Sequence, residues 1–332
     1  MARNNRSKTI TKMKFSELAA QWILSVSHGV KESTLAHYRY TLERYLLPVF
    51  GSDRLFDLDE QRLEQGILQV ISAASGRHKP LGASSSRECL TMLRRICKYA
   101  AHLHLMRTVE VFVKLPQMES CQTKPFSAQE QAALREFVLA APTPRKVGLL
   151  LQMQLGLRIG EVCGLQWGDF DLKANVLTVR RTVSRIYCGI GCTKIVVQTP
   201  KTKSSGREIP IPYDLAALLR KLRGSASPDT WFLSGSTERP VEPRCYRKSI
   251  RGYLRRAGVR RVHPHALRHT FATTCLQSGC DIKTLSEILG HADANVTLKR
   301  YVHSDMKRKK SEMQRVFSAV WKKCPAQLHV SA

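Results

Sequence analysis

The sequence has 332 residues, enough for two domains of ordinary size that each bury a hydrophobic core. Hydrophobic residues make up 43% and charged residues 24%, a balance that excludes a disordered or fibrous chain. Lysine and arginine number 54 against 26 acidic residues, and the resulting net charge of +28 is spread along the whole chain. Such a positive field favours a polyanionic partner, and nucleic acid is the most common one.

Membrane insertion, secretion and metal binding are not expected. No apolar run approaches the roughly 20 residues of a membrane span, and residues 1–14 are polar and basic without the apolar core of a signal peptide. The ten cysteines are scattered, several within helical apolar patterns, as is typical of reduced thiols in an intracellular protein. Cys188 and Cys192 lie close together, but no further cysteine pair completes a zinc site.

The first third of the chain predicts a helical bundle. Residues 1–14 form a basic tail, and apolar residues recur at helical spacing between residues 15 and 112. The predicted helices cover about 15–28, 33–48, 59–73 and 87–105. Amphipathic helices so close together in sequence form a compact bundle, and their exposed lysines and arginines are suited to hold a DNA backbone.

Local residues mark the ends of these predicted helices. Ser33 is a plausible N-cap of the second helix, and Pro48 with Gly51 is expected to end it. The stretch Gly76–Ser86 is rich in small and turn-forming residues, so a loop is predicted there before the fourth helix.

A boundary between domains is predicted at residues 113–126. Apolar periodicity fails there, and the composition is that of an extended linker. Ser127 with Glu130 three positions later forms a capping box that restarts folded structure. The second domain is expected to cover residues 127–322, followed by a tail at 323–332.

The sequence of the second domain predicts helices around a small sheet. A long apolar helix over Arg145–Leu155 ends at Gly156, and a short helix follows as far as Gly164. The period then changes to the alternation of strands, in the runs 176–181, 195–197 and 208–211. Between the last two runs, Thr199–Gly206 is a basic, turn-forming loop, which predicts an antiparallel hairpin that carries lysines. The stretch Ser184–Thr193 is longer than a minimal connection between strands.

Further helices are predicted towards the C-terminus. They cover about 213–222, 243–257, 265–277, 281–289, 297–301 and 305–321. Pro264 stands at the start of the helix over 265–277, and Gly290 follows the helix over 281–289.

His265 and Arg268 form a candidate anion site. They are three residues apart at the first turn of a helix, so their side chains share a face where free backbone N–H groups also favour an anion. In isolation the same spacing also fits a structural histidine beside a surface arginine. His265 and His269 are four apart, but the intervening residues lack the glutamate of the HExxH zinc signature, which excludes a metalloprotease of that type.

Arg158 and Tyr301 are further candidates. Arg158 follows the break at Gly156, where its side chain can project into a cleft or pair with Glu161. Two arginines that converge on one phosphate can bind both of its non-bridging oxygens. Tyr301 needs nearby cations to act as a nucleophile, because its ordinary pKa is about 10. His291 lies ten residues before it, although a lone tyrosine also fits simple packing.

Taken in order, these motifs resemble the tyrosine recombinase (phage integrase) family over nearly the whole chain. The matching stretches are Leu155–Glu161, Lys201–Lys203, His265–Thr273, Leu289–His291 and Thr297–Tyr301. In the first third, Phe15–Leu18 and Pro48–Gly51 are similar to the SAM-like core-binding domain of that family.

The resemblance implies a mechanism. Tyr301 would attack the scissile phosphate, form a 3′-phosphotyrosyl link and release a 5′-hydroxyl, which then attacks the phosphotyrosine of a partner strand. Arg158 and Arg268 would bind the phosphate, with His291 as a further donor to it. The resemblance implies no cofactor, no metal and no ATP, because bond energy is conserved in the protein–DNA link.

Proton transfer is implied by the same resemblance. His265 would accept the proton of the nucleophile, and a lysine of the hairpin would protonate the leaving 5′-oxygen. Lys201 is the first choice for this general acid, and Lys203 on the same loop is the alternative.

The implied fold class is mainly α with a small antiparallel β-sheet in the catalytic domain (α+β), arranged as a two-domain, C-shaped DNA clamp. Residues 15–112 would form the core-binding domain, and residues 127–322 the catalytic domain with its C-terminal helix. The expected partners are double-stranded DNA at recombination sites, three further copies in a homotetramer, and an excisionase or DNA-bending accessory protein. Because only about fourteen residues precede the first helix, binding to arm-type DNA sites is not expected.

The expected task is integration or excision of a mobile element or prophage, in the cytoplasm and associated with the nucleoid. Two alternatives stay open. A type IB topoisomerase-like enzyme would use the same chemistry without exchanging partners, and a catalytically silent protein of the same fold would only bind DNA.

Overall fold

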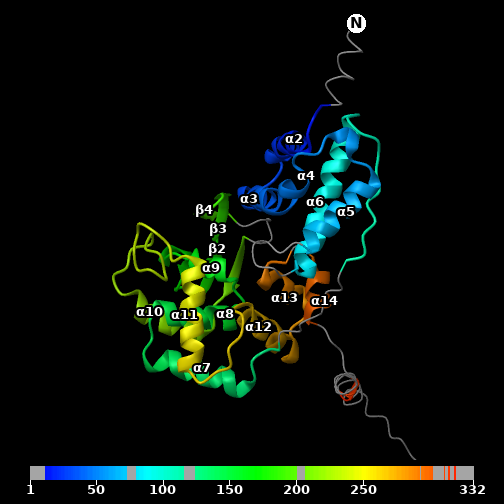
Figure 1. Ribbon diagram of the computed structural model, residues 1–332. Coiled ribbons are helices and arrows are strands. Elements are labelled where there is room, and N and C mark those ends of the chain that lie inside the picture. The colour runs from blue at the N-terminus through cyan, green and yellow to red at the C-terminus, as the bar shows by residue number, and fades with distance from the viewer. Residues whose placement is uncertain are drawn as a thin grey trace, which may run out of the picture.

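The computed structural model describes residues 12–72, 80–115, 124–199, 206–291 and 293–301, together with residues 310, 313, 314 and 318. Within these ranges the chain is mostly helical and carries small antiparallel sheets, which confirms the predicted fold class (Figure 1). None of the described helices combines the length and the apolar character required to cross a bilayer. The predicted helix over 305–321 lies largely outside the described residues.

The first part of the chain forms a bundle of amphipathic helices. Its elements are α2 (Phe15–Ser27), α3 (Glu32–Thr41), η1 (Leu42–Leu46), α4 (Leu47–Phe50), η2 (Leu55–Asp57), α5 (Glu60–Ser72) and α6 (Ala83–His102). Their apolar faces meet in one cluster that includes Phe15, Phe50, Leu63 and Leu93, each 0% exposed. Helical periodicity therefore predicted both the elements and the faces that they bury.

Three predicted boundaries in this bundle are wrong. The second helix begins at Glu32 after the extended residue Lys31, so Ser33 lies within the first turn, where the acidic Glu32 favours the helix N-terminus. Pro48 does not end that helix, whereas the predicted stop at Gly51 is confirmed, because Gly51 is the C-cap of α4. The chain passes through the π-helical turn η1 and then continues into α4, whose first turn accepts a proline because it needs no amide donor there.

The third wrong boundary concerns the loop predicted to reach Ser86. Helix α6 begins at Ala83, and the Ser86 hydroxyl donates to the Gly82 carbonyl oxygen at 3.2 Å. The serine side chain is thereby satisfied within the first turn of the helix, which removes its preference for a loop.

The second part of the chain surrounds small sheets with helices. Its helices are α7 (Ala128–Ala140), α8 (Pro144–Gln154), α9 (Ile159–Cys163), η3 (Trp167–Asp169), α10 (Tyr213–Arg223), α11 (Pro243–Arg256), α12 (His265–Gln277), α13 (Ile282–Leu289) and α14 (Ala294–Tyr301). Its strands are β1 (Phe170–Asp171), β2 (Val176–Val179), β3 (Thr182–Gly189), β4 (Cys192–Gln198) and β5 (Arg207–Pro210). The capping box of Ser127 and Glu130 is confirmed at the start of α7.

The strands pair differently from the prediction. Among the described residues, β1, β2 and β5 form one antiparallel sheet in that order, and β3 with β4 forms a separate hairpin. The loop Thr199–Gly206 therefore joins strands of different sheets, and the predicted hairpin across it is wrong. The reason is that β4 pairs with its immediate neighbour β3 through a tight turn at Gly189 and Gly191, which leaves β5 to pair with β2.

Two separate large clusters of buried apolar side chains lie within the described ranges, one in the bundle and one around α8 and the three-stranded sheet. A smaller cluster joins α12 to α13 through Phe271, Leu285 and Leu289. This smaller cluster fixes the C-terminal end of α13 beside α12.

The β3–β4 hairpin contacts the helical bundle. The Tyr187 hydroxyl donates to Glu43 of η1, and the Lys194 ammonium lies 2.6 Å from a Glu32 carboxylate oxygen of α3. The Tyr187 ring also packs edge-on against Tyr40, with ring centroids 5.3 Å apart. The unexplained length of Ser184–Thr193 is thus a hairpin that reaches the first part of the chain, as Figure 1 shows beside α3.

Candidate functional site

Arg268 lies buried on α12 with a side chain aimed between two other segments. It is 2% exposed, and its guanidinium donates to the Gly156 carbonyl oxygen and the Leu289 carbonyl oxygen, each at 2.7 Å. Gly156 follows α8, against which α12 packs, and Leu289 is the last residue of α13. Arg268 is therefore a buried residue that joins three helices. The alternative of a structural histidine beside a surface arginine is thus wrong for this position.

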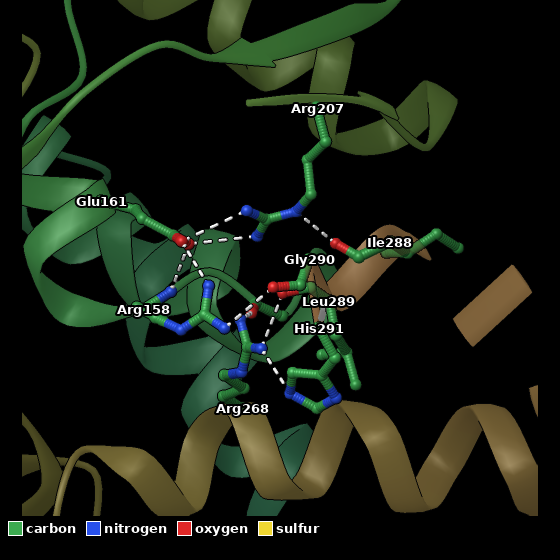
Figure 2. Close-up of polar contacts among 9 residues, drawn as sticks. Arg158, Glu161, Arg207, Arg268, Ile288, Leu289, Gly290 and His291 are labelled. Atoms are coloured by element: carbon green, nitrogen blue, oxygen red, sulfur yellow. Dashed lines mark hydrogen bonds and ion pairs between the residues drawn. The ribbon is translucent and has the colours of Figure 1, made fainter. Parts of the chain in front are cut away.

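The C-terminal end of α13 is the point at which the arginines meet. Arg207 donates to the Ile288 carbonyl oxygen, Arg268 to that of Leu289, and Arg158 to that of Gly290 at 3.1 Å, as Figure 2 shows. The last carbonyls of a helix have no partner within the helix and carry the negative end of its dipole, so cations are favoured there. Consecutive carbonyls thus bring guanidinium groups from three different elements together.

Gly290 makes this convergence possible. Its φ of +64° is left-handed, a conformation in which residues with a side chain are strained. A Cβ at this position would lie 2.9 Å from Arg207 Nη1. Glycine is therefore required both by the backbone turn and by the approach of a guanidinium.

A buried carboxylate holds two of the arginines. Glu161 is 4% exposed and accepts from Arg158 Nη1 at 2.7 Å and from the Arg158 backbone N–H at 2.8 Å. Arg207 donates to both of its oxygens, at 3.1 and 3.0 Å. Burial by itself raises the pKa of Glu161, but Arg207 and then Arg158 outweigh it, so the pKa lies below its usual value. The pairing of Arg158 with Glu161, one of the two alternatives that the sequence offered, is therefore present in the structure.

His291 connects the arginines to α14. Arg268 Nη2 lies 3.0 Å from His291 Nε2, and His291 Nδ1 lies 2.8 Å from the hydroxyl oxygen of Thr297. A guanidinium has no acceptor, so the first contact is a hydrogen bond when Nε2 is unprotonated. The imidazole is then neutral, with its proton on Nδ1 donated to Thr297. Thr297 is 0% exposed, and α14 packs against α13 and α12.

The structure places the predicted residues in different ways. It brings Arg158, Arg268 and His291 together, while His265 is exposed at the first turn of α12. Tyr301 is the last residue of α14, one helical turn after Thr297. Lys201 and Lys203 lie outside the described residues.

Arg207 and Thr297 are site residues that the sequence analysis did not single out. Arg207 shares the inward face of β5 with Ile209. If the predicted strand had begun at residue 207, its alternation would have indicated a buried arginine. Thr297 lies within the motif that ends at Tyr301, but nothing in the sequence pairs it with His291. No group of three or more metal-binding side chains occurs in the described part of the chain.

This arrangement suits an anion with several oxygens. The guanidiniums of Arg158 and Arg268 offer planar donors that match phosphate geometry, and their protein contacts already hold them in place. The exposed fraction of the Arg158 side chain is 36%, so its guanidinium remains open to solvent on one side.

Solved structures of integrases share the fold of this chain. The Tn1549 transposon integrase in complex with transposon right end DNA covers 92% of this chain and all of that chain, with a TM-score of 0.71 and 21% identity. A lambda integrase tetramer bound to a Holliday junction covers 91% of this chain and 82% of that chain, with a TM-score of 0.63 and 15% identity.

The chain belongs to the phage integrase family. The model of that family matches residues 118–308, and the model of its N-terminal SAM-like domain matches residues 14–67. Tyrosine recombinase XerC of Xanthomonas axonopodis pv. citri is 31% identical over 304 residues, which cover 85% of this chain and 90% of that protein. A XerC-like tyrosine recombinase of Caldanaerobacter subterraneus subsp. tengcongensis is 30% identical, and that alignment spans about half of each protein, 51% and 48%.

Proposed function

We propose that this chain is a site-specific DNA recombinase that cleaves and rejoins DNA strands through a covalent link between Tyr301 and a 3′-phosphate. The observation that carries the proposal is the convergence of Arg158, Arg268 and His291 at the end of α13. The next helix, α14, ends at Tyr301 and packs against α13.

The arginines would bind the scissile phosphate. Arg158 and Arg268 donate to adjacent carbonyl oxygens, so their guanidiniums converge where one phosphate would meet both. Negative charge builds on the non-bridging oxygens during attack, and donors fixed in advance stabilise it without reorganising. His291, held between Arg268 and Thr297, would orient the Arg268 guanidinium towards the same phosphate, because both of its own ring nitrogens are engaged.

The reaction would proceed by two balanced transfers. The Tyr301 oxygen attacks phosphorus and loses its proton to His265, while the bond from phosphorus to the 5′-oxygen breaks and that oxygen takes a proton from Lys201 or Lys203. The 5′-hydroxyl of a partner strand then attacks the phosphotyrosine and restores both groups. One phosphate ester replaces another at each step, so the reaction would need neither ATP nor a metal.

The substrate would be double-stranded DNA, enclosed by two domains at residues 15–112 and 127–322. The separate hydrophobic cores of the two parts and the net charge of +28 support a clamp that surrounds a polyanion. Four copies acting on two duplexes would exchange strands, in integration or excision of a mobile element and with a DNA-bending or excisionase partner. The lambda integrase tetramer on a Holliday junction, which shares the fold, supports this assembly.

The proposal is tested by covalent capture from a pool of nicked duplexes of random sequence. A nick beside the cleaved bond lets the short 5′-hydroxyl fragment leave, so a protein–DNA adduct resistant to denaturation accumulates. We expect adduct with the wild type and none with Tyr301→Phe, while Tyr213→Phe, a change at an exposed tyrosine on α10, serves as the matched control. Sequencing the captured DNA then identifies the site.

The same experiment decides between the alternatives. An adduct that persists in Tyr301→Phe overturns the assignment of the nucleophile. DNA binding without any adduct indicates a catalytically silent protein. To distinguish a recombinase from a topoisomerase-like enzyme, the captured sites are placed on two separate duplexes. A recombinase joins the two duplexes to each other, whereas a topoisomerase-like enzyme only relaxes supercoiled DNA.

A further inference from the structure

Arg207 occupies an unusual place for a charged residue. It is the first residue of β5, and the alternation of that strand turns it inward with Ile209. Its side chain is only 6% exposed. A buried guanidinium persists only where it is paired and hydrogen-bonded, so its partners indicate its purpose.

The partners of Arg207 lie on two elements that carry predicted site residues. On one side its Nη1 and Nη2 donate to the two oxygens of Glu161, which in turn holds Arg158. On the other side its Nε donates to the Ile288 carbonyl oxygen near the end of α13, as Figure 2 shows. The rigid, planar fork of arginine allows one side chain to reach both.

The packing around Arg207 adds a second constraint. A Cβ on Gly290 would lie 2.9 Å from its Nη1 and 3.0 Å from its Cδ. The turn that leads from α13 to His291 is thus built closely against this side chain. In the sequence, Arg207 also follows Lys203 by four residues, so it stands where the lysine-bearing loop enters β5.

We infer that Arg207 is a positioning residue for the phosphate site: it fixes Glu161 and the end of α13 relative to each other, and thereby sets the spacing of Arg158, Arg268 and His291. Arg207 itself does not touch the phosphate. The inference rests on the proposed function, because that function defines what the three residues bind.

Without Arg207, the two halves of the site would keep some of their own contacts, but they would be held less firmly relative to each other. Glu161 would still pair with Arg158, and Arg268 would still hold the Leu289 carbonyl. The link between these two pairs would then depend on the contacts of Arg158 with Gly290 and of Arg268 with Gly156. Catalysis is more sensitive than binding to such a loss, because a displacement of about 1 Å can slow a reaction about 100-fold.

The test compares Arg207→Met and Arg207→Lys with Arg181→Met. Arg181 is the matched control, since it pairs with a different buried carboxylate, that of Asp169, which is 2% exposed. Each full-length variant is assayed for thermal unfolding, for affinity to captured DNA and for the rate of adduct formation with enzyme in excess. The change to lysine keeps the charge near Glu161 but lacks the fork that reaches Ile288 as well.

We expect Arg207→Met to slow adduct formation about 10- to 100-fold while DNA affinity changes by no more than about twofold. Arg207→Lys should recover part of the rate. Arg181→Met should destabilise the fold and leave the rate of the folded protein unchanged. This split between rate and affinity is a result that a merely structural role would not produce.

The pH dependence gives an independent measurement. The charged groups that face the Glu161 carboxylate are Arg158, before α9, and Arg207, from β5. Removing Arg207 leaves the burial of Glu161 in place, so the pKa of Glu161 should rise above its wild-type value. The rate of Arg207→Met relative to the wild type should therefore fall as the pH is lowered.

The possible failures are distinguishable. Adduct formation by Arg207→Met at the wild-type rate, with a pH-independent ratio, overturns the positioning role and leaves the proposed function intact. No adduct with either the wild type or Arg181→Met overturns the proposed function itself. If Arg207→Met shows no cooperative unfolding, Arg207→Lys decides: a wild-type rate overturns the inference, and a folded variant that cleaves about tenfold more slowly supports it.

Discussion

Replacing Gly290 with alanine should damage the site through one defined contact. Two effects add in this variant. A side chain at φ +64° costs about 1–2 kcal/mol of backbone strain. The new Cβ would also lie 2.9 Å from Arg207 Nη1, so the guanidinium must shift, and weakening one of its charged hydrogen bonds costs about 1.5–3 kcal/mol.

Gly258 supplies the matched control for this change. Its φ is +67°, nearly that of Gly290, but no atom lies within 4 Å of a Cβ built there. Gly258→Ala should therefore lose only the strain energy. The difference between the two variants isolates the contact with Arg207, and about 1.5–3 kcal/mol corresponds to roughly 3–12 °C in melting temperature for a domain of 150–250 residues.

Urea unfolding and adduct formation on a nicked duplex measure the two consequences. We expect Gly290→Ala to lose more unfolding free energy than Gly258→Ala, and to form adduct more slowly at equal DNA affinity. Equal losses of stability together with equal rates in the two variants would refute the reasoning. The contact between the Gly290 turn and Arg207 would then contribute neither to the unfolding free energy nor to the rate of adduct formation.

Three further predictions concern charge and burial. Glu161→Gln should lose about 3–5 kcal/mol of unfolding free energy at neutral pH. Because folding lowers the pKa of Glu161 from 4.5, this difference should persist above pH 4.5 and shrink as the pH falls through the folded value, as urea unfolding across pH would show. Burial raises the pKa of Cys89 and Cys97 to about 12, so alkylation followed by mass spectrometry should label the exposed Cys245 before either of them. The logarithm of the DNA-binding constant should fall linearly with the logarithm of salt concentration, with a slope of about −0.9 for each phosphate contacted, and a flat response would contradict a phosphate-bound clamp.

Local sequence determined much of this protein. Helical periodicity predicted the bundle of the first part, and the capping box of Ser127 and Glu130 predicted where α7 begins, because both depend on residues within a few positions of one another. The order of short motifs indicated the family, and the family models confirmed it. These features need no knowledge of which distant segments meet.

The tertiary structure decided the features that depend on distant segments. The partner of β5 is β2, some thirty residues earlier, and local spacing instead favoured the nearer β4. Burial of Arg268 and the role of Arg207 follow from carbonyls on α13 that lie far away in sequence. A pattern of residue types cannot show which backbone carbonyls will lack a partner at the end of a packed helix. The sequence thus supplied the arginines and the histidine of the site, whereas the packing of α12 and β5 against α13 decided how they are held together.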